Sequence, residues 1–234
     1  HGHYVAVLGD ITDQKRAEQE LRYLANYDTL TSLPNRALLS ERLSRAIVKA
    51  RRGNTRIAML FLDLDRFKDI NDSLGHAAGD RILRAAAHRL QHAVGATHTV
   101  ARLGGDEFTV LLENLESIEH AEQVARDVLA SFEAPLDIDQ RHDVVISPSI
   151  GISLYPDHAL VPTDLLKHAD TAMYQAKAAG RRTFMRYTEA MDVEIRGRAT
   201  ISAALRGVLD RNELRLVFQP KLSLDHSRIT GVEA

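Results

Sequence analysis

The chain has 234 residues, of which 44% are hydrophobic, so it is long enough for one large domain or for one domain with pieces of its neighbours. Its formal net charge of −2 argues against a basic surface for a nucleic-acid polymer or an acidic membrane. The absence of cysteine excludes a disulfide scaffold and a thiolate metal site, and it suits a reducing compartment. Because no apolar run reaches about 18 residues, we expect no membrane contact in this stretch of chain.

Two helical segments follow a short β-like run at residues 4–9. Residues 14–27 have a helical composition with a sparse apolar stripe, which includes Leu21 and Leu24. Turn-forming residues at 28–35 end this helix, and Asn35 can cap a second one over 36–51.

Residues 57–62 are apolar on both faces, which is typical of a central strand. This strand runs directly into Asp63-Leu64-Asp65. Acids at the end of a buried strand are costly unless something compensates them, and a metal ion is the usual compensation. The period of two puts Asp63 and Asp65 on the same face, so the pattern alone does not choose between them.

Residues 67–76 are predicted to form a loop, and residues 77–93 a helix with apolar side chains at Ile82, Ala86 and Leu90. A strand, a loop and a helix start favour an anion, because unpaired backbone N–H groups and the helix dipole both attract phosphate. Lys68 adds a positive charge to this segment.

The stretch from Arg102 to Phe108 reads Arg-Leu-Gly-Gly-Asp-Glu-Phe between two apolar runs. This pattern predicts a hairpin whose turn, at Gly104 and Gly105, needs a positive φ or a close backbone approach. Bare backbone can touch a phosphate ester while Asp106 and Glu107 supply ligands for a divalent cation. The alternative is an ordinary hairpin turn with solvated acids. If the hairpin lies beside the strand that ends at Asp63, the side chains of Asp63 and Asp106 can share one cation.

The second half alternates helices with short strands. Helices are expected at 116–132, at 164–179 with Gly180 after its end, and at 189–211, and strands at 136–139, 144–146, 150–154 and 183–187. Lys177 and Arg181 lie one turn apart near the end of the second of these helices. Cations at that position complement the helix dipole, so a structural role is available to both.

Four motifs in this order resemble those of the GGDEF family of diguanylate cyclases. They are Asp28-Thr-Leu-Thr-Ser-Leu-Pro-Asn-Arg, Asp63-Leu-Asp-Arg-Phe-Lys68, the signature at 104–108, which matches letter for letter, and Tyr174-Gln-Ala-Lys177 with Arg181. The resemblance covers about residues 24–187. It implies an α+β fold with a mostly antiparallel five-stranded central sheet flanked by helices, similar to the palm of nucleotidyl cyclases and polymerases.

The resemblance also implies roles for individual residues. Asp63, the Leu64 carbonyl and Asp106 would bind Mg²⁺, with Mn²⁺ as a substitute, and Glu107 would be the base beside a ribose 3′-hydroxyl. Asp65 is then a structural hydrogen-bond acceptor. The residues implied to bind the nucleotide are Lys68, Asn71, Asp80, Gly104, Gly105, Lys177 and Arg181.

Of these, Asn71 and Asp80 would read the guanine base. A carboxylate can accept from N1–H and from the N2 amine of guanine together, whereas adenine presents an acceptor at N1. The competing interpretation of Asp80 is a solvated acid in the first turn of a helix.

The implied reaction joins two GTP molecules into cyclic di-GMP and releases two pyrophosphates. One GTP per half-site means that two domains face each other, as a homodimer formed transiently. A rival interpretation is a binding module that keeps GTP affinity, turns over poorly and regulates an attached phosphodiesterase. A third is a non-catalytic dimerisation domain. The family implies a cytoplasmic domain and leaves open whether the full-length protein is membrane-anchored.

The flanks of the predicted GGDEF domain, residues 28–187, resemble parts of other signalling domains. Residues 1–11 look like the end of a PAS sensor domain, 12–27 like a signalling linker helix and 188–212 like a second linker helix. Residues 213–234 look like the truncated start of an EAL phosphodiesterase domain. We expect no phosphodiesterase activity from that segment, because most of the EAL barrel and its metal ligands are missing.

One position departs from the family pattern. Many relatives carry an inhibitory product site, Arg-Xaa-Xaa-Asp, five residues before the first glycine of the signature. Here residues 95–98 read Gly95-Ala-Thr-His98. Without an arginine fork to bind a phosphate through two hydrogen bonds, we expect product inhibition at this site to be weak or absent.

Overall fold

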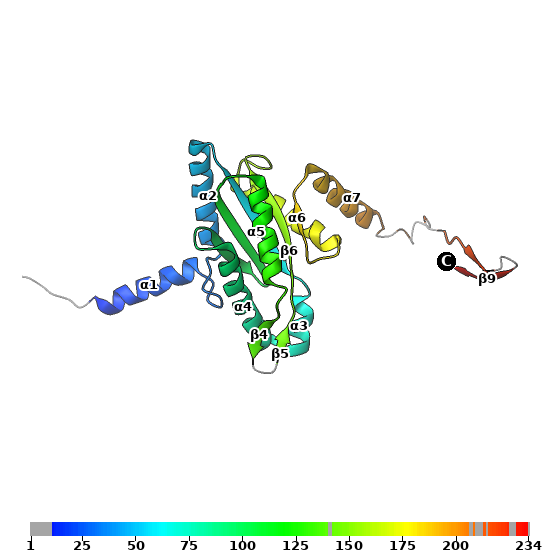
Figure 1. Ribbon diagram of the computed structural model, residues 1–234, viewed down its shortest axis with the longest axis horizontal. Coiled ribbons are helices and arrows are strands. Elements are labelled where there is room, and N and C mark those ends of the chain that lie inside the picture. Colours follow the sequence, from blue (N-terminus) through cyan, green and yellow to red (C-terminus); the bar gives the residue numbers. More distant parts are fainter. Residues whose placement is uncertain are drawn as a thin grey trace, which may run out of the picture. The chain divides into compact units, whose positions relative to one another are not determined.

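The computed structural model describes residues 11–139, 142–205, 208, 213, 215–224 and 228–233 (Figure 1). The described chain divides into two compact units, with the boundary between Met191 and Asp192. The helices of the first unit are α1 (Thr12–Asn26), α2 (Arg36–Gly53), α3 (Phe67–Leu74), α4 (His76–Val94), α5 (Ile118–Ser131) and α6 (Pro162–Ala178). Its strands are β1 (Arg56–Leu64), β2 (Thr99–Gly104), β3 (Glu107–Leu115), β4 (Leu136–Asp139), β5 (His142–Val144), β6 (Pro148–Tyr155) and β7 (Phe184–Arg186).

A five-stranded sheet in the order β2-β3-β1-β6-β7 forms the centre of the first unit. Its β2–β3, β3–β1 and β1–β6 pairs are antiparallel, while β7 runs parallel to β6. The predicted α+β class with a mostly antiparallel five-stranded sheet is therefore confirmed, and the sheet is mixed because of β7. Strands β4 and β5 form a separate two-stranded hairpin. The predicted strand at 136–139 is confirmed, whereas the one predicted at 144–146 lies at 142–144.

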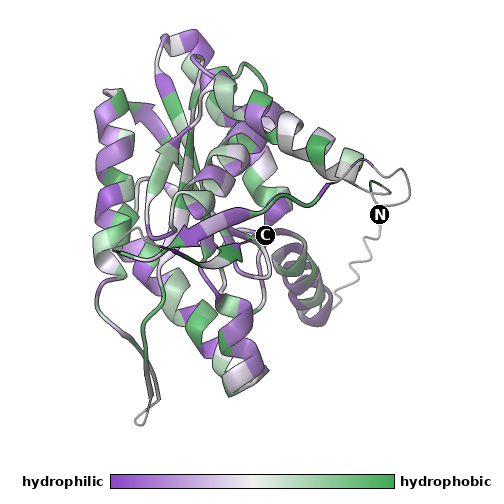
Figure 2. Ribbon diagram, turned by 90° about the vertical axis from the view of Figure 1, so that its right-hand side faces the viewer, coloured by the Kyte–Doolittle hydropathy of each residue, from purple (hydrophilic) through white to green (hydrophobic). Residues whose placement is uncertain are grey.

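Strand β1 is buried on both faces, as expected for a central strand. Ala58, Leu60 and Leu62 belong to the hydrophobic core that includes residues of α4 and α5. The alternating residues, among them Met59 and Phe61, belong to a second core formed with α2 and α6. Figure 2 shows helices with alternating hydrophobic and hydrophilic stretches, which is the pattern of helices that cover a sheet with one face. Asp63 continues the second set and therefore faces α2 and α6.

The prediction of a loop after β1 is wrong. Residues 67–74 form helix α3, which begins after Arg66 in the left-handed region (φ 58°) and ends at Gly75 (φ 80°). Phe67 is buried and Ile70 packs against the same core. Phe67 and Ile70 lie three residues apart, so a helix places both on the face toward the core. The segment is too short for this spacing to stand out in the sequence. Gly75 alone separates α3 from α4.

The flanking segments are described only in part. Residues 1–10, which include the predicted strand of a PAS-like end, lie outside the described residues. Helix α7 (Glu189–Leu205) covers most of the predicted 189–211 helix, and the rest of that prediction falls largely outside the described part. Strands β8 (Gln219–Leu222) and β9 (Ile229–Glu233) form a hairpin in the second unit. No described helix has both the length and the apolar character to cross a membrane.

Helix α6 lies so close to β6 that Gly151 has no room for a side chain. A Cβ at this position would lie 2.0 Å from the Ala169 carbonyl oxygen and 2.1 Å from the Met173 nitrogen. Both obstructing atoms are backbone atoms of α6, so α6 itself would have to move.

We predict that Gly151→Ala lowers the free energy of unfolding by about 3 kcal/mol, at the upper end of the range for overpacked cores. The shift of the urea unfolding midpoint measures this loss, provided that the m-value is unchanged. Gly53→Ala is the matched control, because its Cβ would meet only Thr55 at an ordinary distance of 3.6 Å. Equal midpoints for the two variants would contradict close packing of α6 on β6.

Candidate active site

The signature turn joins β2 to β3 at Gly104 (φ 140°) and Gly105 (φ 52°), and both glycines are exposed. The predicted positive φ values are confirmed. A Cβ on either glycine would meet nothing within 4 Å. The backbone conformation, rather than a lack of space, therefore favours glycine here, and it leaves bare backbone open to a ligand.

The turn meets the end of β1. Asp63 lies directly opposite Glu107 in the antiparallel β1–β3 pair, and the Leu64 N–H donates to the Asp106 carbonyl oxygen at 3.3 Å. Directly opposed residues have Cβ atoms about 4.5–5.5 Å apart. The structure therefore places the signature hairpin beside the strand that ends at Asp63 and Leu64, which was the stated condition for a shared cation.

Helix α6 adds a cation to this cluster. Lys177 Nζ lies 2.7 Å from Asp63 Oδ2, and the side chains are 28% and 13% exposed respectively. Burial raises the pKa of the Asp63 carboxyl; the Lys177 hydrogen bond opposes this, and the charges of Asp106 and Asp65 add to it. The net shift is upward because burial outweighs the contact with Lys177.

A hard dication fits this donor set. Among the described residues, no three His, Cys, Asp or Glu side chains converge in a way that could hold a metal ion. The implied ligands are two carboxylates, Asp63 and Asp106, and the carbonyl of Leu64. Mg²⁺ is typically bound by one or two protein carboxylates with substrate phosphates and water completing its shell, so such a site would be completed by the nucleotide.

Glu107 has an acidic neighbour that the sequence analysis missed. Burial raises the pKa of Glu107, and the charge of Asp170 on α6 raises it further, while Arg36 opposes both. The Asp170 side chain is exposed to solvent, yet enough protein surrounds its carboxyl to raise its pKa, with Lys177 opposing. Asp170 lies seven residues before Lys177, and this two-turn spacing was the signal that places both on one face of α6.

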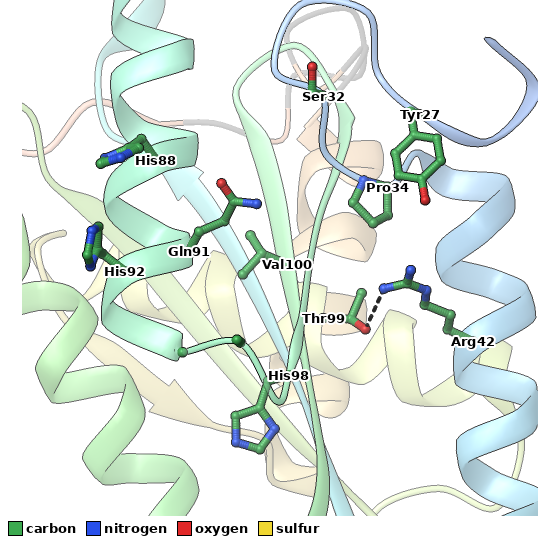
Figure 3. Close-up of a pocket in the computed structure, with 12 residues that line it drawn as sticks. Tyr27, Ser32, Pro34, Arg42, His88, Gln91, His92, His98, Thr99 and Val100 are labelled. Atoms are coloured by element: carbon green, nitrogen blue, oxygen red, sulfur yellow. Dashed lines mark hydrogen bonds between the residues drawn. The ribbon is translucent and has the colours of Figure 1, made fainter. Parts of the chain in front are cut away.

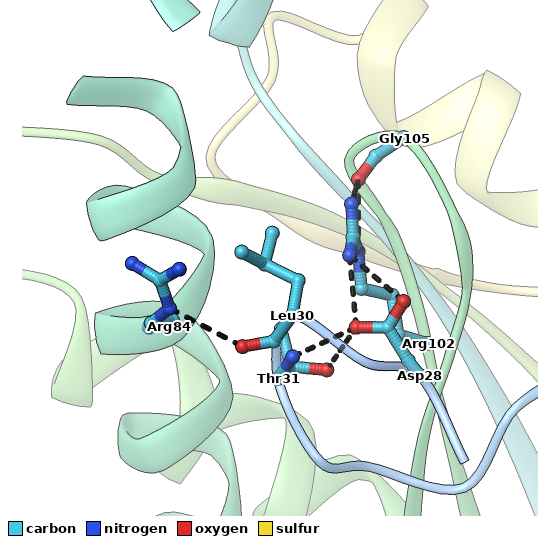
Figure 4. A network of polar contacts seen from close by, with 6 residues as sticks. All are labelled: Asp28, Leu30, Thr31, Arg84, Arg102 and Gly105. Atoms are coloured by element: carbon cyan, nitrogen blue, oxygen red, sulfur yellow. Dashed lines mark hydrogen bonds and ion pairs between the residues drawn. The ribbon is translucent and has the colours of Figure 1, made fainter. Parts of the chain in front are cut away.

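An arginine inside the signature holds the turn to the N-terminal segment (Figure 4). Arg102 donates to both Asp28 carboxyl oxygens at 2.9 and 3.0 Å, and to the Gly105 carbonyl oxygen at 3.1 and 2.7 Å. Asp28 also accepts from the Thr31 N–H and hydroxyl at 2.9 and 2.6 Å. The arginine side chain is only 10% exposed, so it is a largely buried link between this segment and the signature turn.

Asp65 is a structural acceptor, as the sequence analysis expected. Its carboxyl accepts from Ser149 Oγ at 2.7 Å, Ser147 Oγ at 3.0 Å and the Arg182 N–H at 3.1 Å. The Arg181 Nε atom lies 3.9 Å from the same carboxyl. These contacts hold the segment after α6 against the end of β1.

Helix α6 ends in the predicted way. Gly180 follows it with φ 120°, its N–H donates to the Lys177 carbonyl, and the Arg181 N–H donates to the Ala176 carbonyl. This is the Schellman pattern. It directs the chain from the end of α6 toward Asp65, and Arg181 keeps 49% of its side chain exposed.

The other three residues expected to bind the nucleotide lie on α3 and α4. Lys68 is exposed in the first turn of α3, and Asp80 is exposed in α4. The Asn71 amide oxygen is buried, and no described residue is within hydrogen-bond reach of it. Their proposed roles toward a nucleotide stay predictions.

A separate cavity of about 610 Å³ lies at the other end of β2 (Figure 3). Gly95, Ala96 and His98 line it, at the position of the family's inhibitory motif. Its one arginine, Arg42, donates to the Thr99 hydroxyl at 3.1 Å. The expectation of weak product inhibition stays a prediction.

The sequence profile described as "Diguanylate cyclase, GGDEF domain" matches residues 25–183. The chain belongs to the GGDEF family. It is similar to the bifunctional diguanylate cyclase/cyclic di-GMP phosphodiesterase MucR of Pseudomonas aeruginosa, with 42% identity over 95% of this chain and 32% of MucR. It is also similar to the diguanylate cyclase TpbB of the same organism, with 48% identity over 72% of this chain and 39% of TpbB. The chain thus spans about a third of the length of these curated relatives.

The solved GGDEF domain of TpbB from Pseudomonas aeruginosa matches this GGDEF protein with a TM-score of 0.71 and 45% identity. The match covers 73% of this chain and 99% of that one. It confirms the fold predicted for the GGDEF domain.

We predict that the Asp28–Arg102 link makes stability depend on acid pH. Burial alone raises the pKa of Asp28, but hydrogen bonds from Thr31 and Arg102 outweigh it and leave the pKa below its ordinary value. A lowered folded pKa contributes stability above the unfolded pKa of about 3.9, and this contribution is lost as pH falls through the folded value.

The measurement is the free energy of unfolding of wild type and Asp28→Asn in urea, from pH 7 down to pH 3. The gap between the two should be largest near neutral pH and shrink below about pH 4. Asp72→Asn, at an exposed position of α3, is the control for loss of one negative charge. A gap that stays constant over the whole range would exclude the charged link as its source.

Proposed function

We propose that this GGDEF domain condenses two GTP molecules into cyclic di-GMP and releases two pyrophosphates. The observation that carries the proposal is the meeting of the signature turn with the end of β1, which sets Glu107 opposite Asp63 and Asp106 beside Leu64. The name of TpbB, a diguanylate cyclase 48% identical over 72% of this chain, supports the same reaction.

In this proposal the ribose 3′-hydroxyl of one GTP attacks the α-phosphorus of the other in line. The new bond joins the 3′-oxygen to phosphorus, and the bond between the α-phosphorus and the bridging oxygen breaks, so that pyrophosphate leaves. Glu107 accepts the hydroxyl proton, and burial and neighbouring acids raise its pKa in the direction that a base near neutral pH requires. Lys177 binds the phosphates as a point charge and Arg181 through its planar N–H donors. The bare backbone of Gly104 and Gly105 lets a nucleotide approach.

Asp63, the Leu64 carbonyl and Asp106 would hold Mg²⁺, or Mn²⁺ as a substitute. A bound dication supplies Lewis-acid polarisation of the phosphoryl oxygens. Lys177, whose Nζ lies 2.7 Å from Asp63 Oδ2, would place its positive charge beside the leaving pyrophosphate.

A homodimer is part of the catalytic proposal. Each domain offers one signature turn, and the ring-shaped product joins two nucleotides through two equivalent bonds. Two copies that face each other can form both bonds by the same reaction. The exposed glycines of the turn leave the site open toward such a partner. Contact between copies is proposed to be transient.

The second candidate is a GTP-binding module that regulates an attached EAL phosphodiesterase. The name of MucR, of which this chain covers 32%, includes a cyclic di-GMP phosphodiesterase, and this supports the attached phosphodiesterase in the second candidate. Under either candidate we propose that residues 1–11 end a PAS-like sensor domain, that 12–27 and 188–212 are linker helices, and that 213–234 begin an EAL domain.

We predict that Glu107→Gln lowers pyrophosphate release from GTP and Mg²⁺ by about 10²- to 10⁴-fold, because the variant cannot accept the proton. GTP binding, followed by thermal shift, should be retained. Glu116→Gln is the matched control, since Glu116 is exposed outside the site, and its rate should equal that of wild type. If wild type binds GTP but yields no product at micromolar protein, the result would favour the GTP-binding module. If GTP causes no thermal shift, the result would favour a non-catalytic dimerisation domain.

We predict that Asp80→Ala weakens GTP binding by about tenfold or more, which corresponds to a hydrogen bond with a charged group. ATP binding should be nearly unchanged, because adenine has no N1–H to donate. The control is Asp72→Ala, which removes an exposed acid nearby. Equal losses for GTP and ATP in titration calorimetry would remove Asp80 from base recognition.

A further inference from the structure

Helices α3 and α4 meet at a very tight connection. Gly75 ends α3 and precedes α4, and its N–H donates to the Asn71 carbonyl at 2.8 Å. The chain therefore folds back at once, and the side chain of Asn71 on α3 comes to lie against the backbone of Gly79 on α4.

Gly79 leaves the space that the Asn71 amide occupies. A Cβ at Gly79 would lie 1.8 Å from the Asn71 Oδ1 atom, 2.9 Å from its Cγ and 3.2 Å from Phe67 Cζ. Real Cβ atoms do not approach other heavy atoms so closely. The obstructing atoms are the ends of side chains rather than backbone, so α3 and α4 could keep their positions while the amide turns away. Glycine also lowers the stability of a helix interior, and this close approach is a reason for its presence.

The same contact determines which end of the amide meets a ligand. The Asn71 oxygen is enclosed and has no hydrogen-bond partner in the described part of the chain, although the residue as a whole is only partly buried. The amide nitrogen is then the polar end left for a ligand, and it can only donate. At the position where adenine carries its N6 amine, which is a donor, guanine carries the O6 acceptor. A donor held in place by Gly79 therefore favours guanine.

We infer that Gly79 is a positioning residue for guanine selectivity: its missing Cβ holds the Asn71 amide in the orientation that reads the base. The inference deepens the proposed function, and its statement about guanine selectivity rests on that function. Its second part is that a Cβ at position 79 and the Asn71 side chain compete for the same space. This part does not depend on any nucleotide.

The test is a double-mutant cycle of Gly79→Ala and Asn71→Ala, read by the affinity for the α,β-methylene analogues of GTP and ATP, which cannot release pyrophosphate. Gly79→Ala alone should weaken the GTP analogue about fivefold or more, as for loss of a base-reading contact, and change the ATP analogue by less than about twofold. In the Asn71→Ala background, Gly79→Ala should change neither affinity, because the residues act as one unit. An equal loss in both backgrounds would overturn the inference.

Thermal unfolding of the same proteins tests the competition for space between a Cβ at position 79 and the Asn71 side chain. In the Asn71→Ala background, Gly79→Ala should raise Tm, because alanine is the better helix former once the space is free. In the wild-type background this gain should vanish or reverse. Gly197→Ala, whose Cβ would meet nothing within 4 Å, is the control for glycine replacement in a helix. The same Tm change in both backgrounds would overturn the inference. If the Tm values follow the expected pattern but wild type does not prefer the GTP analogue over the ATP analogue, the proposed guanine recognition would be overturned instead.

Discussion

The antiparallel register of β1 and β3 is the constraint on which the site depends. It sets Asp63 opposite Glu107 at the end of both strands, where the signature turn delivers Asp106 to the backbone of Leu64. Carboxylates held so close repel one another, and burial adds to the cost of keeping them charged. Lys177 offsets part of that cost at 2.7 Å from Asp63, and the upward shift of the Asp63 pKa that remains is what a phosphate-bound dication would relieve.

The two acids of the Asp63-Leu64-Asp65 motif have different partners in the structure. Asp63 faces an ammonium and the signature acids, whereas Asp65 is satisfied by two serine hydroxyls and a backbone N–H. A carboxylate whose lone pairs are already used is a poor metal ligand, since binding a cation would break those bonds. Asp65 instead connects β1 to the segment that carries Arg181.

The signature turn is also held from the N-terminal side. Arg102 joins the Asp28 carboxyl to the Gly105 carbonyl, and its own N–H donates to the Pro34 carbonyl at 3.0 Å. Asp28 begins the turn that follows α1, and α1 buries none of its residues. The position of the glycine turn is thus tied to the segment directly after a helix that has no core of its own.

The sequence by itself determined the elements whose signals are local: the two-sided apolar run of β1, the Asn35 cap, the glycine turn with positive φ and the glycine after α6. It also singled out Asp63, Asp106 and Glu107, because a motif states residue types and spacing. Only the tertiary structure decided what depends on neighbours distant in sequence: the α3 helix with its packed Phe67, the partners of the Asp65 carboxyl, the approach of Asp170 to Glu107, and the fit of Asn71 against Gly79. These contacts arise when the sheet brings separate segments together, and no spacing along the chain encodes their distances.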